Sequence, residues 1–407
     1  MSRARLAVAA LALAGAVATS AAASTDADPG VTGTTILLGG TAPLSGPASA
    51  YSSIARGAAA YFKYANARGG VNGRRILYTY LDDGYDPAQT VPATTQLVER
   101  DRVFAVFNSL GTAQNEAVRP YLNQSQVPQL FAASAATTFG RDYKRYPWTI
   151  GFQPSYRAEG RIYGTFLART KARARVAVLF QNDAYGKDLL AGLKQGIARS
   201  TVRVIAAEPY EVTAADVQAE VAGLKASGAD VLAIFATPKF ATEAYVFAER
   251  LRWRPLVIVN AVSSASNVMT SAVRASAAGA VEGSISIVYL KDPTSRSWRD
   301  DVAMRLYRSI MARYARGANV RDVFHVYGMA VAYETVKVLK AAGANPTRAD
   351  VMAQVRKLND PSNPFLLPGI VVRTSATDRF PVEQVLLQRW SQGSWSAFGG
   401  LWGYRAG

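Results

Sequence analysis

The feature that most limits the fold of this chain is the repeated alternation of short Val- and Ile-rich runs with segments of helical period. Helices and strands alternate in this way when parallel strands form a sheet that helices cover on both faces. Runs such as "VFAVF" and "VLAIF" are apolar at every position, as a strand buried on both faces requires. The alternation therefore predicts an α/β fold built on parallel sheets.

We predict strands at the apolar runs and helices at the segments of helical period. The predicted strands are residues 35–43, 75–82, 103–109, 128–133, 148–152, 175–180, 203–210, 230–236, 256–261 and 283–290. The predicted helices are residues 52–67, 113–124, 156–170, 186–199, 216–227 and 240–252. One sheet holding all these strands would be unusually wide, and 407 residues exceed a typical single domain, so we expect two lobes.

The two lobes are expected to exchange segments of chain. Residues 31–151 make the first part of lobe 1, and residues 152–288 make lobe 2. Residues 289–378, which include three helical segments without an obvious strand between them, return mostly to lobe 1. Residues 379–407 are predicted to form a C-terminal hairpin that returns to lobe 2 and turns at "SQG".

The N-terminus has the pattern of a secretory signal peptide. Arg3 and Arg5 precede an uncharged apolar run, and the alanines at 21–23 are the small residues that signal peptidases accept. We expect cleavage after Ala23, which removes residues 1–23 and leaves the protein in the periplasm. The apolar run falls short of the roughly 20 residues that span a bilayer. Because the chain contains no cysteine, we expect neither a lipid-modified N-terminal cysteine nor disulfides.

The chain is strongly basic, with a formal net charge of +17. The basic residues are scattered and lack the interleaved aromatic residues of a nucleic-acid groove, so no nucleic-acid partner is expected. A positive surface can still steer an anionic solute toward the protein.

Several kinds of catalytic and cofactor site are excluded by residue counts. With one histidine and no cysteine, zinc motifs and Cys/His nucleophile pairs cannot be built, so no metal site is expected. A Ser-His-Asp hydrolase would need His325, which sits in a helical apolar pattern, and a G-x-S-x-G elbow that the chain lacks. The Gly-rich residues 39–57 match neither a P-loop nor a dinucleotide fingerprint, so no cofactor is expected. The carboxylates of Asp82 and Asp83 are assigned to loop hydrogen bonding or helix capping rather than catalysis.

Hydroxyl-bearing and small residues follow several of the predicted strands. Because the carboxyl ends of parallel strands meet at one edge of a sheet, these residues are expected to surround a small, partly apolar solute. The candidates from the strand-end loops are Tyr51, Ser109, Thr112, Ser134, Tyr185, Thr237 and Asn260.

The quoted stretches "GGTAPLSGPASAYSSIARGAAAYFKYANARGGVNGRRILYTYLDDGYDP", "VPQLFAASAA" and "VAVLFQNDAYGKDLLAGLKQGI" resemble the solute-binding proteins of bacterial ABC importers, in the leucine/isoleucine/valine-binding branch. The similarity runs in order and spacing from about residue 35 to 340. It implies the fold of a type I periplasmic binding protein, in which two Rossmann-like lobes joined by three crossovers close over one solute. It also implies delivery of that solute to an inner-membrane ABC permease, by a protein that we expect to be a monomer.

The resemblance also assigns roles to individual residues. Tyr51 matches the aromatic residue that covers the ligand side chain, and Tyr185 matches the second-lobe tyrosine that closes over the site. The positions that correspond to the family's site for a ligand carboxylate are Gly111, Thr112, Ala133 and Ser134.

Two departures from the family pattern bear on the choice of solute. In the amino-acid binders an acidic residue after the ninth strand meets the ligand ammonium group, whereas this chain has "IVNAVSSAS". Thr237 stands where an aromatic residue is common. A branched-chain amino acid, or a related small carboxylate or aromatic acid that lacks the amine, is therefore expected. Two other classes stay open: a ligand-sensing domain of a membrane receptor, and a hydrolase.

Overall fold

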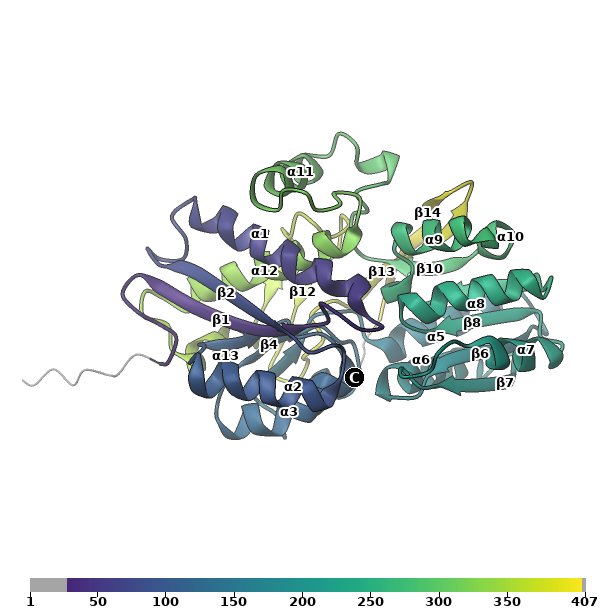
Figure 1. Cartoon of the computed structure of the whole chain (residues 1–407), viewed down its shortest axis with the longest axis horizontal. Coiled ribbons are helices and arrows are strands. Elements are labelled where there is room, and N and C mark those ends of the chain that lie inside the picture. The colour runs from purple at the N-terminus through teal and green to yellow at the C-terminus, as the bar shows by residue number, and fades with distance from the viewer. Residues whose placement is uncertain (1–27, 405–407) are drawn as a thin grey trace, which may run out of the picture.

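A computed structural model describes residues 28–404, and two sheets form its frame (Figure 1). The predicted signal peptide lies outside the described residues. The fold combines helices with sheets whose strands are mostly parallel, which confirms the expected α/β fold class. None of the helices between residues 28 and 404 is both long and apolar enough to cross a bilayer.

The first sheet has the strand order β2-β1-β3-β4-β5, and all its pairs are parallel. Its strands are β1 (Thr35–Ala42), β2 (Arg75–Asp82), β3 (Ala105–Phe107), β4 (Gln129–Ala132) and β5 (Thr149–Gly151). One face packs against α1 (Ser53–Asn66) and α12 (Val323–Ala341), and the other against α2 (Pro87–Thr95) and α3 (Thr112–Gln124). The burial of β3 and β4 at every position follows from this double cover.

The second sheet has the order β14-β13-β10-β9-β8-β6-β7. Its strands are β6 (Arg175–Gln181), β7 (Arg203–Tyr210), β8 (Val231–Phe235), β9 (Leu256–Val259), β10 (Ile285–Val288), β13 (Gln384–Ser391) and β14 (Ser394–Gly403). Helices α5 (Tyr156–Thr170) and α6 (Ala184–Ile197) cover one face. Helices α7 (Gln218–Ala226), α8 (Pro238–Arg250) and α9 (Ser266–Ala272) cover the other.

Most sequence expectations about elements match the structure. Each predicted strand and helix has a counterpart, and the C-terminal hairpin pairs β13 with β14 around Gln392 and Gly393. Three helical segments follow the tenth strand: α11 (Val302–Tyr314), α12 and α13 (Arg348–Val355). The predicted helix ranges do not include α2, which begins directly after "DDGYD", or α9, which is rich in Ser and Ala. The small pair β11 (Asn359–Asp360) and β12 (Val372–Arg373) was not expected either.

The chain passes between the two sheets three times: after β5, after β10, and before β13. The second passage is tied to residues 365–367, because the Lys291 amide donates to the Phe365 carbonyl (3.0 Å) and the Leu367 amide to the Tyr289 carbonyl (2.9 Å). Backbone pairing at this point gives the crossover region a defined geometry. The division into lobes at residues 151, 288 and 378 stays a prediction.

Candidate functional site

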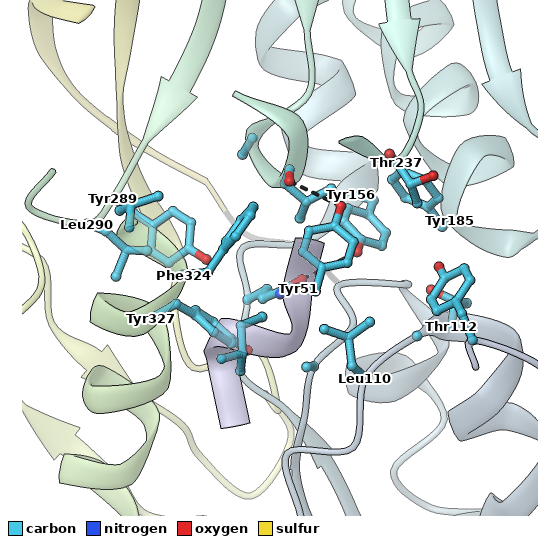
Figure 2. A pocket seen from close by; sticks show the side chains of 18 residues that line it. Tyr51, Leu110, Thr112, Tyr156, Tyr185, Thr237, Tyr289, Leu290, Phe324 and Tyr327 are labelled. Atoms are coloured by element: carbon cyan, nitrogen blue, oxygen red, sulfur yellow. Dashed lines mark hydrogen bonds between the residues drawn. The ribbon is translucent and has the colours of Figure 1, made fainter. Parts of the chain in front are cut away.

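A cavity with about 610 Å³ of empty space lies where the strand-end loops of the two sheets face each other (Figure 2). The first sheet contributes Tyr51 and residues 110–112, and the second contributes Tyr185, Thr237 and residues 261–262. This figure includes open solvent at the mouth of the cavity, so the space that the wall closes off is smaller.

Aromatic rings dominate the wall of this cavity. None of the lining residues within the described part of the chain carries a charged side chain. A site with this composition gains affinity from ring contacts and apolar burial. The rings belong to Tyr51, Tyr85, Tyr156, Tyr185, Tyr289, Phe324 and Tyr327.

Tyr51 reaches the cavity from a short 3-10 turn, Ser49–Ser52, after β1. Its ring meets Phe324 edge-on, with centroids 5.0 Å apart. Its hydroxyl donates to the Val262 carbonyl at 3.1 Å, so it joins a loop of the first sheet to a loop of the second. Burial raises the pKa of Tyr51 well above its ordinary value, so the hydroxyl stays protonated even in alkaline solution.

The adjacent carboxylates hold the loops that carry Tyr51 and Tyr85. Asp82 Oδ1 accepts from the backbone amides of residues 44, 45 and 84 at 2.9, 3.2 and 3.0 Å. Asp83 accepts from the Tyr85 amide at 3.1 Å and from the Thr90 hydroxyl at 2.9 Å. The expected loop role of these two residues is confirmed. Gly46 is required here, because its φ is +77° and a Cβ would overlap the backbone of residue 84.

The polar end of the cavity lies at the start of α3. Gly111 directly precedes this helix and has a φ of +109°. Glycine adopts this backbone conformation easily, whereas other residues would be strained in it. The first-turn amides of a helix have no carbonyl partner within it and carry a partial positive charge. The Thr112 hydroxyl lies 2.7 Å from the Ser134 hydroxyl and lines the same end. These groups suit the oxygen atoms of an anion.

Tyr185 lies in the first turn of α6 and is almost completely buried, with 2% of its surface exposed. Its ring packs 4.8 Å from the Tyr156 ring, centroid to centroid. Its hydroxyl lies 2.6 Å from the Asn260 side chain, whose amide is best oriented with nitrogen donating to the carbonyls of Ile234 and Ala236 and oxygen accepting from Tyr185. The Tyr185 ring faces the cavity, and its hydroxyl makes its hydrogen bond to Asn260 behind the cavity wall.

The structure brings most of the sequence candidates together. Of the nine, those that line the cavity are Tyr51, Gly111, Thr112, Ala133, Tyr185 and Thr237. The other three lie behind the wall: Ser109 accepts from the Thr41 amide (2.9 Å), Ser134 meets Thr112, and Asn260 holds Tyr185.

Several lining residues were not anticipated from the sequence. Tyr85 follows the second strand in "DDGYDP", so the strand-end rule could have found it. Tyr289 lies in a crossover, and Phe324 and Tyr327 lie in the first turn and a half of α12. Nothing in their local sequence separates these three from core aromatic residues.

Glu159 supports the site from behind. Its Oε1 accepts from the Ala261 amide at 2.6 Å and from the Tyr163 hydroxyl at 2.7 Å. Burial raises the pKa of Glu159 to about 7, although both hydrogen bonds oppose this rise. Through Ala261 it orients the 3-10 turn Ala261–Ser263, which carries the carbonyl that Tyr51 contacts. Glu159 is therefore a positioning residue rather than a lining one.

His325 lies in α12 next to Phe324 and is 1% exposed, but it lines neither this cavity nor a smaller neighbouring one. The sequence expectation of a helix residue is confirmed, and its burial is nearly complete. Residues 28–404 contain no group of three or more His, Asp or Glu side chains placed to hold a metal ion.

Two sheets, repeated crossovers and a cavity at facing strand ends define the class of two-lobed α/β binding proteins. This chain belongs to the periplasmic binding protein family, whose model matches residues 35–394.

Curated relatives and solved structures support this assignment. A binding protein for leucine, isoleucine, valine, threonine and alanine from Pseudomonas aeruginosa is 28% identical over 195 residues, which cover 48% of this chain and 52% of that protein. The match therefore spans about half the length of such relatives. A fatty acid ABC transporter substrate-binding protein from Thermomonospora curvata superposes with a TM-score of 0.79 at 19% identity, covering 93% of this chain and 95% of that one. A branched chain amino acid ABC transporter from Thermus thermophilus with bound valine gives 0.79 at 17% identity, with 92% and 97% covered. At these identities, the two structures show a shared fold.

Proposed function

We propose that this protein is the periplasmic solute-binding component of an ABC importer, which captures a small organic carboxylate by hinge closure and delivers it to an inner-membrane permease as a monomer. Family membership and the curated relatives support the transport role. The cavity composition supports the class of solute.

The observation that carries the choice of solute is a cavity with a helix N-terminus at one end and no charged side chain among the described residues that line it. The first-turn amides of α3 and the Thr112 hydroxyl can stabilise a carboxylate. An α-ammonium group would have no lining carboxylate, and a buried charge without a partner costs several kcal/mol. A carboxylate without an α-amine therefore fits better than a branched-chain amino acid.

Contacts between elements of the first sheet and elements of the second support a hinge mechanism. The Tyr51 hydroxyl bonds to the Val262 carbonyl, and the Thr137 amide donates to Asp188 Oδ2 at 2.7 Å. Each contact joins a loop of the first sheet to an element of the second. A ligand that touches both sides would favour this closed arrangement over an open one. Micromolar affinity needs only about −8 kcal/mol, which burial on both sides can provide.

Binding without catalysis fits the chemistry of the site better than hydrolysis. His325, the one histidine of the chain, lies outside the cavity wall, so it cannot serve as a general base at a bound solute. The curated relatives are binding proteins. A receptor-type sensor would use the same cavity, and only a permease that accepts the loaded protein distinguishes the two roles.

The experiment compares leucine with 4-methylpentanoate, which has the same carbon skeleton without the amine. We expect the deaminated acid to raise the melting temperature of the protein at concentrations where leucine has little effect, because the shift follows affinity. Acetate serves as a control for nonspecific anion effects. If leucine gives the larger shift, the proposed solute class is wrong; if 4-methylpentanoate behaves like acetate, the carboxylate site is wrong.

A further inference from the structure

A second cavity adjoins the first, with about 370 Å³ of space that includes open solvent at its mouth. The two cavities share four lining residues: Ala261, Tyr289, Leu290 and Val323. In Figure 2, Tyr289 and Leu290 lie at the opposite end of the first cavity from Thr112 and Tyr185. The second cavity therefore lies beside the first, on the side that is away from the start of α3.

The walls of the second cavity are mostly apolar. Ala265 lies at the start of α9, and Ile287 and Val288 come from β10. Gln388 of β13 lines it as well, and its Nε2 donates to the Ile287 carbonyl at 3.3 Å. These residues offer contact area to an apolar chain rather than a set of hydrogen-bond partners.

Asp292 is the one charged side chain among the described residues of either wall. Its Oδ2 accepts from the Ser266 hydroxyl at 2.5 Å. Its Oδ1 accepts from the Thr294 amide and hydroxyl, both at 2.7 Å. Both oxygens are thus satisfied within the adjoining loops, so the second cavity does not require a cationic ligand group.

We propose that the two cavities form one elongated binding site, and that its ligand is a carboxylic acid with an extended apolar chain. This inference rests on the proposed carboxylate-binding function. The carboxylate lies at the start of α3, the proximal part of the chain passes among the aromatic rings, and the distal part passes Tyr289 and Leu290 into the second cavity. An acid of about six carbons would leave the second cavity unused.

Chain length is then the property that controls affinity. Each methylene that moves from water into an apolar wall raises affinity about fourfold. Four further methylenes in the second cavity would raise affinity on the order of 100-fold, allowing for incomplete burial of the last ones. A site limited to the first cavity would instead lose affinity with long chains, since they would clash with its far wall.

The test measures the binding of hexanoate and decanoate by calorimetry to the wild-type protein, to Val288→Phe and to Val204→Phe. Of the two cavities, Val288 lines only the second. The phenyl ring of Val288→Phe is larger than the valine side chain and therefore narrows that cavity. Val204 is a similarly half-buried valine on β7, the edge strand of the same sheet, and its variant controls for general effects of the substitution.

The wild type and Val204→Phe are expected to bind decanoate about 100-fold more tightly than hexanoate. Val288→Phe is expected to lose most of this difference while it keeps the affinity for hexanoate. Equal affinities for the two acids in the wild type, or an unchanged ratio in a folded Val288→Phe, would overturn the inference and leave the proposed function standing. Failure of both acids to bind would overturn both. If Val288→Phe does not fold, Ala265→Leu takes its place, since Ala265 also lines only the second cavity.

Discussion

The Tyr185 hydroxyl is hydrogen-bonded to the Asn260 side chain behind the cavity wall, and the Tyr185 ring packs against the Tyr156 ring. Replacing Tyr185 with Phe keeps the ring and leaves the Asn260 oxygen without its donor. We expect Tyr185→Phe to lower the free energy of unfolding by about 1–3 kcal/mol, measured in urea. Ligand affinity should change less than threefold, because the ring still lines the cavity.

Tyr314→Phe, at a half-buried position of α11, is the matched control and should be nearly neutral. A strong loss of ligand affinity in Tyr185→Phe without loss of stability would mean that the hydroxyl contacts the ligand directly.

Glu334 is a fully buried carboxyl on α12 whose Oε1 accepts from Asn363 at 2.9 Å. Burial raises its pKa from 4.5 to about 8, so the folded protein keeps a proton that the unfolded chain releases near pH 4.5. The unfolded state then binds fewer protons, and stability falls as pH rises between about 4.5 and 8. Glu159, with its pKa raised to about 7, acts in the same direction.

We expect Glu334→Gln to remove much of this fall, because the amide keeps the acceptor for Asn363 and has no proton to lose. The measurement is the urea midpoint at pH 5 and at pH 8.5. Glu99→Gln, at an exposed carboxylate, should leave the wild-type pH dependence unchanged. An equally steep fall in Glu334→Gln would show that other groups cause it.

At the scale of elements, α1 and α12 cross so closely that glycine is needed on both helices. A Cβ at Gly57 would overlap the His325 carbonyl, and one at Gly328 would overlap the Ile54 carbonyl. This contact places the start of α12, with Phe324 and Tyr327, against the loop that carries Tyr51. We expect Gly328→Ala to cost about 1–3 kcal/mol of unfolding free energy through overpacking.

A Gly→Ala substitution should raise stability, rather than lower it, at a helix position where the added methyl group meets no other atom. Gly223 lies in the exposed part of α7 with no atom within 4 Å of an added Cβ. Gly223→Ala should therefore raise stability by about 0.5–1 kcal/mol, as helix propensity predicts. A neutral Gly328→Ala would mean that the two helices can separate at little cost.

Across the whole molecule, hydrogen bonds join loops of the first sheet to elements of the second: Tyr51 with Val262, and Thr137 with Asp188 of α6. A double variant, Tyr51→Phe with Asp188→Ala, should favour an open form. We expect a larger radius of gyration by X-ray scattering without ligand, and a weaker affinity by about 30-fold, since the two bonds contribute about 1 kcal/mol each.

Saturating ligand should return the double variant to the compact form. Asp216→Ala, which removes an exposed carboxylate near α7, controls for the change in charge. If the wild type scatters identically when empty and when saturated, hinge closure does not describe this protein.

The sequence by itself determined the order of the elements and the class of fold. Apolar runs and helical periods indicate which faces are buried, because the spacing of apolar residues follows the period of the strand or helix that carries them. Strand-end position also identified Tyr51, Thr112 and Tyr185, because parallel strands send their carboxyl ends to one edge.

Which side chains of those loops face the cavity, and how far the cavity extends, depend on the tertiary packing. Ser109 and Asn260 turn to buried backbone and side-chain partners, since an unpaired polar group inside the protein is costly. Tyr289 and Tyr327 enter the cavity from segments distant in the chain. Their placement depends on how the crossovers and α12 pack. This packing results from contacts between residues that are distant in the chain, so the local sequence does not predict it.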